Sequence, residues 1–167
     1  MSGSVAITRH SPYVWVRPRG MVTCVTTTGS GLAALIRPTP VVTVAVGYRG
    51  RTHRVLLKRE CHHPTGSIKY RTAVGLLQDL DRTSPLRPGT VVVESTSGGL
   101  GAALAHLLVP LGCRLIAAVD PKTPPVTRRE LAAAGVELHC VTETDGHGGY
   151  LFTRLRLVQE LCRAHPD

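Results

Sequence analysis

The chain has 167 residues and a mass of 17.9 kDa, a length typical of a single domain. Hydrophobic residues make up 43% and charged residues 19%, a globular composition that excludes a disordered chain. The formal charge is +9, but residues 1–59 hold nine basic side chains and no acidic one, whereas residues 60–167 hold eleven of each sign. The excess positive charge is confined to one third of the chain, and aromatic residues are few. Both observations argue against nucleic-acid binding as the function.

The lengths of the apolar runs and the spacing of the cysteines indicate in which compartment the protein works. No run of about 18 apolar residues exists, so the sequence predicts no membrane-spanning helix. The five cysteines are widely spaced, without a Cys-x-x-Cys pair, which indicates reduced and mostly buried thiols. We therefore expect a cytoplasmic protein.

Residues 1–35 give no clear periodicity, and we expect a poorly defined basic extension there, with residues 1–20 unstructured or not part of the protein and Met21 as an alternative start. Residues 36–167 are expected to form one domain. Its first feature is a pair of β-branched or aliphatic runs, Val41–Val46 and Arg54–Lys58, around Gly47–Gly50. This pattern predicts a hairpin or short connection.

The rest of the domain alternates strand and helix patterns. Apolar strands are predicted at Thr90–Glu94, Arg114–Val119 and Val136–Val141. After the Pro64–Ser67 turn, apolar residues follow helical spacing at Ala73, Leu76, Leu77 and Leu80. Further helices are predicted from Leu100, over Thr127–Ala134 and from Leu151. Short connections and continuous apolar strands predict an α/β fold, with a parallel sheet of about four strands and helices on both faces.

The first segment with chemical potential is Lys58–Arg71, which places Lys69 in the first turn of a predicted helix. The partial positive charge of a helix N-terminus disfavours a second cation and so favours a neutral amine. A neutral lysine amine is what Schiff-base chemistry requires. The alternative is a solvated surface lysine, although lysine occurs only three times here beside 17 arginines.

The second segment is Val91–Gly101, in which a strand passes through hydroxyl and glycine residues into a helix. Backbone N–H groups of such a loop can bind a carboxylate or a phosphate. A plain tight turn is one alternative. A Rossmann-type nucleotide site is another, with Gly98, Gly99 and Gly101 under a pyrophosphate and Asp120 near a ribose, but the full G-x-G-x-x-G spacing is missing.

A third cluster, Cys61-His62-His63, offers three metal-binding residue types in a row. Adjacent side chains in an extended stretch point alternately apart, so they rarely converge on one ion. We expect no metal site there.

Taken together and in order, three segments resemble fold-type II pyridoxal-phosphate enzymes, the cysteine synthase and cystathionine β-synthase family. Residues 64–69 (PTGSIK) are similar to the family's N-P-T-G-S-x-K segment, and residues 94–101 (ESTSGGLG) to its E-x-(S/T)-S-G-N-x-G loop. Residues 37–42 (RPTPVV) resemble its G-N-T-P-L-V entry segment. Residues 148–161, with Arg154, resemble the diaminopropionate-forming branch of the family.

This resemblance implies the small-domain fold of these enzymes and pyridoxal 5'-phosphate as cofactor. Lys69 would hold the cofactor and transfer protons, while Thr96, Ser97 and Gly98 would bind the α-carboxylate of an amino-acid substrate. Gly99 would be cofactor-binding, at the position of the asparagine that contacts the cofactor's 3′ oxygen. The implied reaction is β-elimination or β-replacement on an activated serine.

Two residues depart from the family's motifs, and the resemblance covers only part of such an enzyme, so alternative functions stay open. Gly99 replaces an asparagine and Tyr70 an aspartate, and the family's phosphate-binding cup lies beyond the position matched by residue 167. The resemblance therefore implies the N-terminal half of such an enzyme, completed by a complementary chain or by homo-oligomerisation. The hypotheses are a synthase/lyase or its N-terminal part, an inactive relative or partner subunit, and a Rossmann-type module.

Overall fold

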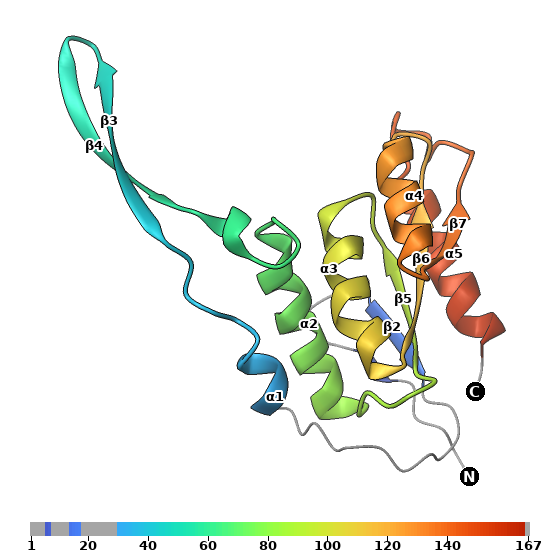
Figure 1. Cartoon of the computed structure of the whole chain (residues 1–167). Helices are drawn as coiled ribbons and strands as arrows, with labels where there is room; N and C mark the ends of the chain where they lie inside the picture. Colours follow the sequence, from blue (N-terminus) through green and yellow to red (C-terminus); the bar gives the residue numbers. More distant parts are fainter. Residues whose placement is uncertain (1–5, 8–13, 18–29, 166–167) are drawn as a thin grey trace.

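The computed structural model describes residues 6–7, 14–17 and 30–165 (Figure 1). Five strands form one sheet in the order β1-β2-β5-β6-β7, and β3 and β4 form a separate hairpin. The sheet strands are β1 (Ala6–Ile7), β2 (Val14–Arg17), β5 (Val91–Ser95), β6 (Arg114–Val119) and β7 (Glu137–Cys140). The helices are α1 (Ser30–Ala33), α2 (Lys69–Thr83), α3 (Gly99–Leu108), α4 (Pro125–Ala133) and α5 (Leu151–Ala164), with short 3₁₀ turns η1 (Glu60–His62) and η2 (Val109–Leu111).

The α/β fold expected from the sequence is confirmed, with three parallel strands rather than about four. β5 pairs in parallel with β6, and β6 with β7, through the three strands that the apolar runs predicted. The strand on the other side of β5 is β2, which pairs with it antiparallel and aligns Trp15 with Val93. A four-residue strand far from its partner in sequence leaves too weak a periodic signal to be recognised.

Helices cover both faces of the sheet, as predicted (Figure 1). Alternate strand residues point to opposite faces, so each strand contributes to two separate cores. On one face Val92, Leu115, Ala117 and Val119 pack against α2, α3 and α4. On the other face Val91, Val93, Ile116 and Ala118 pack against Val158 and Leu161 of α5.

Proline and glycine set several element ends. α4 begins at Pro125, two residues before the predicted start, because a proline in the first helical turn needs no N–H partner and has a helical φ. α4 is followed by Gly135, whose φ of 81° is the left-handed conformation that glycine adopts without strain. The short connections that result keep β5, β6 and β7 in register.

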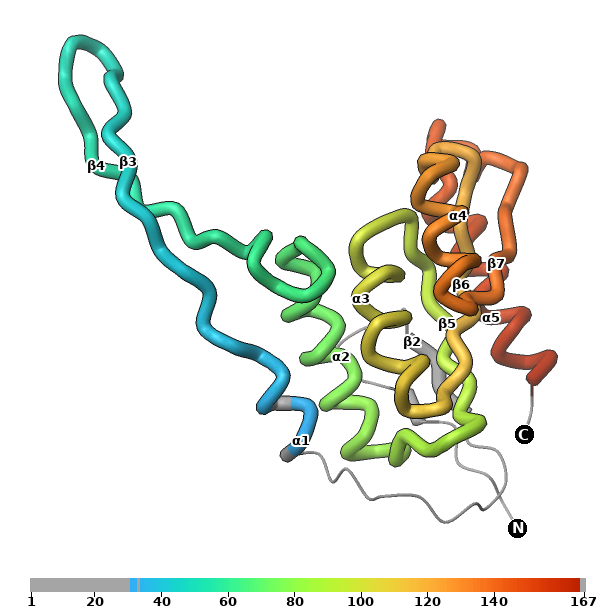
Figure 2. Tube along the Cα trace, in the orientation of Figure 1, coloured from blue at the N-terminus to red at the C-terminus, as the bar shows by residue number. Residues whose placement is uncertain are grey.

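The predicted hairpin is confirmed and is longer than expected. β3 (Val41–Tyr48) and β4 (Arg51–Lys58) pair antiparallel along their whole length. Arg49 and Gly50 form the turn with φ of 49° and 72°, the positive values that two-residue hairpin turns require. Figures 1 and 2 show this hairpin, which we call the arm, projecting away from the sheet and helices.

The arm has one distinctly apolar face. Cross-strand partners share a face, and Val42 lies opposite Leu57 as Val44 lies opposite Val55. We call this side the apolar arm face; its apolar members are Val42, Val44, Val46, Val55 and Leu57, and Tyr48, Arg51 and His53 lie on the same side toward the tip. The other side carries the cations Arg54 and Lys58. Every arm residue is exposed except the half-buried Val44, so the described chain leaves this face uncovered.

Cysteine burial differs from the prediction. Within the described residues Cys113 is buried and Cys162 half-buried, whereas Cys61 and Cys140 are exposed, so the expectation of mostly buried thiols is wrong. Cys24 lies outside the described residues. No helix in residues 30–165 is long and apolar enough to cross a membrane.

Candidate functional site

Lys69 is the first residue of α2, and its side chain is exposed. The residue before it, Ile68, already has helical dihedrals, so the helix starts without a side-chain cap at that position. Instead the hydroxyl of Ser67 accepts the backbone N–H of Lys69 at 3.2 Å. This local bond fixes the backbone from which the lysine side chain leaves the helix.

The two segments singled out in the sequence meet at Gly99. A Cβ atom on Gly99 would lie 3.0 Å from Ser67 Oγ and 3.6 Å from Lys69 Cγ. The first residue of α3 therefore rests against the first turn of α2, although thirty residues separate Gly99 from Lys69. Glycine allows this close approach because it has no side chain.

The Thr96–Gly98 loop combines a buried anchor with open backbone groups. Thr96 is buried, and its Oγ1 accepts the N–H of Gly101 at 2.9 Å, which leaves its own hydroxyl hydrogen to donate. Ser97 is exposed and Gly98 half-buried. Among the described residues no acceptor takes the backbone N–H of Ser97 or Gly98. The loop thus presents donors beside the α3 N-terminus, an arrangement that suits an anionic group.

Glu60 gathers four partners at the foot of the arm. Its Oε1 accepts the Thr39 hydroxyl at 2.9 Å and lies 3.7 Å from Lys58 Nζ. Its Oε2 accepts Arg71 Nε at 2.7 Å and lies 2.9 Å from His63 Nε2. The Arg71 bond lowers the pKa of Glu60 to about 2, helped by Thr39 and His63 and opposed by partial burial. This carboxylate joins residues from three separate segments.

Tyr70, which replaces the aspartate of the resembled motif, is a core residue. It is 2% exposed, stacks on His63 with ring centroids 5.3 Å apart, and meets the edge of His106 at 5.9 Å. Burial raises the pKa of its hydroxyl. His63 turns inward to Glu60 and Tyr70, while Cys61 and His62 are exposed, so the three neighbouring side chains do not converge.

Asp120 does not suit the ribose-binding role of the Rossmann alternative. It is 5% exposed; its Oδ1 accepts the N–H groups of Lys122 and Thr123 at 2.8 and 3.1 Å, and its Oδ2 lies 3.1 Å from Arg154 Nη1. Oδ1 is engaged by the turn after β6, and Oδ2 is paired with Arg154 of α5. A buried carboxylate with these contacts leaves little access for a sugar hydroxyl.

A buried carboxyl precedes the loop. Glu94 is 2% exposed near the end of β5, and its Oε2 has no hydrogen-bond partner among the described residues. Burial raises its pKa to about 8, opposed by a backbone hydrogen bond from Ser95 and by the charge of Arg154. Glu94 is therefore protonated at neutral pH.

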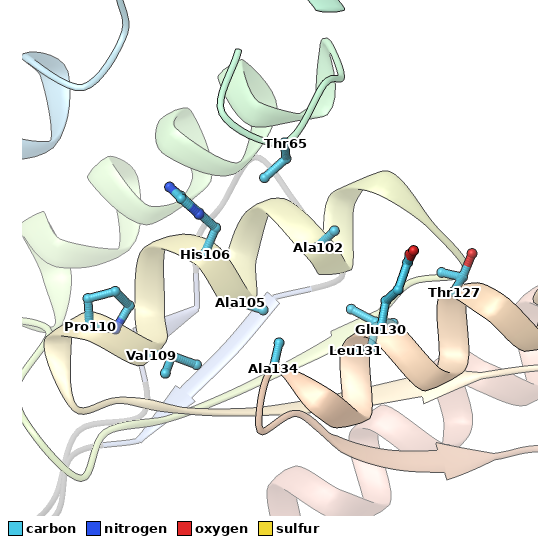
Figure 3. Close-up of a pocket in the computed structure, with 10 residues that line it drawn as sticks. All are labelled: Thr65, Ala102, Ala105, His106, Val109, Pro110, Thr127, Glu130, Leu131 and Ala134. Atoms are coloured by element: carbon cyan, nitrogen blue, oxygen red, sulfur yellow. The ribbon is translucent and has the colours of Figure 1, made fainter.

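A separate pocket lies between α3 and α4, with Thr65 among its lining residues (Figure 3). Its volume is about 420 Å³, and apolar side chains such as Ala102, Ala105 and Leu131 make up most of its lining. Lys69 and the Thr96–Gly98 loop do not line it. The pocket is distinct from the candidate site.

Sequence reasoning predicted Lys69 and the Thr96–Gly99 loop and missed the Glu60 cluster. Glu60 and Arg71 were read only as neighbours of Lys69, since no motif spacing links them. One signal was present: Glu60 is the first acidic residue after nine basic ones. A carboxylate that follows nine cations in the sequence has several possible partners of opposite charge.

Comparison with known proteins places these features in a family. A family model for pyridoxal-phosphate-dependent enzymes matches residues 32–167. The chain is 38% identical over 128 residues to N-(2-amino-2-carboxyethyl)-L-glutamate synthase of Ralstonia nicotianae, covering 77% of this chain and 38% of that protein. The chain thus spans well under half the length of this curated relative.

Solved structures agree. A hydrogen sulfide-producing enzyme from Fusobacterium nucleatum superimposes with a TM-score of 0.70 at 26% identity, covering 83% of this chain and 41% of that one. O-ureido-L-serine synthase superimposes with a TM-score of 0.63 at 26% identity, covering 83% and 42%. The chain belongs to the family of pyridoxal-phosphate-dependent enzymes.

Proposed function

We propose that this chain supplies the cofactor-holding lysine and the substrate-carboxylate loop of a pyridoxal-phosphate-dependent amino-acid synthase or lyase. The reaction class is β-elimination or β-replacement on an activated serine. The observation that carries the proposal is the meeting of Lys69 and Gly99: a Cβ on Gly99 would lie 3.6 Å from Lys69 Cγ. The Lys69 side chain thereby leaves α2 next to the N-terminus of α3, which the loop with open backbone donors precedes.

The residues present fit pyridoxal phosphate at its aldehyde end. Lys69 is exposed at the start of α2, and the absence of a side chain at Gly99 lets the α3 N-terminus approach Ser67 and Lys69 closely. When bound, the cofactor supplies an electron sink for negative charge at the substrate's α-carbon. Lys69 would hold the cofactor through its Nζ, and its amine would accept the proton from that carbon.

The loop orients the substrate. The N–H groups of Ser97 and Gly98 and the hydroxyls of Thr96 and Ser97 donate to the α-carboxylate. The Thr96 oxygen is already fixed by the Gly101 N–H at 2.9 Å, so its hydroxyl hydrogen has a restricted direction. Such preorganised donors bind the carboxylate without reordering the loop.

Further polypeptide completes the site in this proposal. The chain covers 38% of the curated relative and 41% and 42% of two solved ones. Because the apolar arm face is uncovered in the described chain, we propose that a complementary chain or a second copy covers it. The cytoplasm remains the compartment we propose, because exposed thiols such as Cys61 and Cys140 persist in a reducing environment.

A second candidate is a catalytically inactive partner subunit of the same family. Gly99, at the position of the motif's asparagine, favours it, because glycine offers no side-chain contact to a cofactor. The substitution at Tyr70 does not favour the inactive subunit, because the Tyr70 side chain is buried in the core.

Substrate turnover separates the two candidates. The chain, combined with the C-terminal part of the related synthase that it does not cover, is incubated with pyridoxal phosphate and O-phospho-L-serine as probe, and phosphate release is measured for wild type and Lys69→Ala. Release that depends on Lys69 supports the synthase or lyase. Cofactor attachment at Lys69 without any Lys69-dependent release would contradict it and favour the inactive subunit.

A further inference from the structure

We propose that Glu60 is a positioning residue for Lys69: its carboxylate clamps both ends of the loop that carries the lysine. The inference rests on the proposed function only in taking Lys69 as the reactive amine. Glu60 itself lies on η1 and is nine residues away from Lys69 in the chain. Its effect is exerted through His63 and Arg71.

The clamp encloses the loop in sequence and in space. His63 precedes the loop, Arg71 follows Lys69 by two residues, and both contact the same oxygen, Oε2, at 2.9 and 2.7 Å. Two anchors on one atom fix the separation of the loop ends. Residues 64–68 therefore have little freedom to shift relative to the first turn of α2, which carries Lys69, Tyr70 and Arg71.

Bonds inside the loop carry this constraint to the lysine. The N–H of Gly66 donates to the His63 carbonyl at 2.8 Å, and the N–H of Lys69 donates to Ser67 Oγ. Gly66 has a φ of 65°, which favours glycine at this turn. The His63–Tyr70 stack adds a second link from the clamp to the residue after Lys69.

The other carboxylate oxygen ties this loop to the entry segment and the arm. Oε1 accepts the Thr39 hydroxyl at 2.9 Å, and Lys58 Nζ lies 3.7 Å from Oε1 and donates to the Thr39 carbonyl at 3.4 Å. Arg71 Nη2 also donates to the Arg37 carbonyl at 3.4 Å. The side chains of Glu60 and His63 are 14% and 2% exposed, so water competes weakly for these bonds.

An uncharged side chain of equal size cannot replace the carboxylate. Glutamine has one acceptor oxygen, so it can accept on the Thr39 side or on the Arg71 side but not on both. With that oxygen toward Arg71 and His63, its amide NH2 faces the Thr39 hydroxyl, which can accept, and the Lys58 ammonium, which cannot, and the negative charge that attracts Arg71 and Lys58 is lost. Glu60→Gln therefore loosens the clamp with little change in volume, and Glu143→Gln, at an exposed glutamate, is the matched control.

The test follows Lys69 directly and does not depend on cofactor binding. The chain has only three lysines, Lys58, Lys69 and Lys122. Labelling lysine with ¹³C gives three side-chain NMR signals, which Lys69→Ala and Lys122→Ala assign. Hydrogen exchange reports the protection of the Lys69 amide in the same samples.

In Glu60→Gln we expect the Lys69 signal to move toward the shift of a free lysine and its amide to exchange at least tenfold faster. Lys122, α5 and the glutamate control should stay unchanged. An unaltered Lys69 signal and amide would overturn the proposal, as would equal changes at Lys69 and Lys122. If the substitution unfolds the chain, Thr39→Val removes one bond from Oε1, and the same Lys69-specific response is required of it.

The outcome is separable from the proposed function. Failure of wild-type chain to attach pyridoxal phosphate at Lys69 would count against the function and leave the NMR result intact. Conversely, attachment that is equally efficient in Glu60→Gln, with unchanged Lys69 signals, would leave the function standing and remove Glu60 from it.

Discussion

Glu94 is a buried carboxyl two residues before the Thr96–Gly98 loop. Its folded-state pKa of about 8 lies above the ordinary value of 4.5 because burial disfavours the charged form. A raised acid pKa means that the folded chain binds more protons than the unfolded chain. The stability linked to Glu94 is therefore fully present below pH 4.5 and is lost as pH rises toward 8.

Glu94→Gln should remove this pH dependence. The amide is nearly isosteric and does not ionise, so we expect the variant to match wild type near pH 4.5 and to be more stable at pH 7 by about 3 kcal/mol. Urea unfolding across this pH range measures the difference. Glu160→Gln, on the exposed side of α5, should give no such divergence. Parallel pH profiles for wild type and Glu94→Gln would contradict the assignment.

Candidate site residues were recognisable where a local pattern marks them. The first-turn position of Lys69 and the hydroxyl-glycine loop at residues 96–99 are such patterns, and the roles of these residues stay predictions. Glu60 has no local signature, and Glu94, although it opens the 94–101 motif, carries no local sign of its burial. Their environments depend on Thr39, Arg71 and the sheet, which are brought together only by folding.

At the scale of elements, two glycines in helices provide a matched comparison. Gly75 lies inside α2, and a Cβ there would meet nothing within 4 Å. Gly101 lies in the first turn of α3, and a Cβ there would lie 2.8 Å from Thr96 Cγ2 and 3.3 Å from Leu131 Cδ2. Helix propensity favours alanine at both positions, so any difference reports the contact with Thr96 and Leu131.

Gly75→Ala should raise the free energy of unfolding by about 0.5–1 kcal/mol, because alanine loses less backbone freedom on folding. Gly101→Ala should lower it by about 1–3 kcal/mol, since Thr96 must rotate or the helix must shift. Chemical denaturation measures both. Equal stabilisation by the two alanines would show that Gly101 is not required for the packing of the loop.

The elements themselves were largely readable from the sequence. Amphipathic spacing predicted α2 and α5, and apolar runs predicted β5, β6 and β7, because each pattern is local. The arm was also predicted, since alternation of β-branched residues and a glycine turn are local signals. β1 and β2 were not, because two- and four-residue strands acquire their identity only by pairing, β2 with β5 and β1 with β2.

At the scale of the whole molecule, the apolar arm face predicts association. Leu57 lies on this face and is 46% exposed, whereas its neighbour Leu56 lies on the opposite face and is 71% exposed. Uncovered apolar faces drive self-association when no other partner is present. We therefore expect purified chain to elute larger than 17.9 kDa at high concentration.

Leu57→Thr should weaken this association and Leu56→Thr should leave it nearly unchanged, because only the first removes apolar area from the face in question. Light scattering coupled to size-exclusion chromatography gives the mass as a function of concentration. A monomer at all concentrations, or equal effects of the two substitutions, would contradict association through the apolar arm face.

The structure shows where part of the excess positive charge of residues 1–59 lies. Four of the basic residues among the first 59, Arg49, Arg51, Arg54 and Lys58, lie on the arm. The neutral remainder carries Lys69 and the loop at Thr96–Gly99. Composition alone could locate the charge in the sequence but not on a projecting hairpin, because that placement depends on the arm's separation from the sheet (Figure 2).

The central claim is that Lys69 is the residue that holds pyridoxal phosphate. Purified chain mixed with the cofactor is reduced with borohydride, digested, and the modified lysines are identified by mass spectrometry, with Lys58 and Lys122 as internal references. We predict that the reduced cofactor is found on Lys69 in large excess over the other two, and that Lys69→Ala abolishes the excess. Equal modification of all three lysines, or none at Lys69, would contradict the claim.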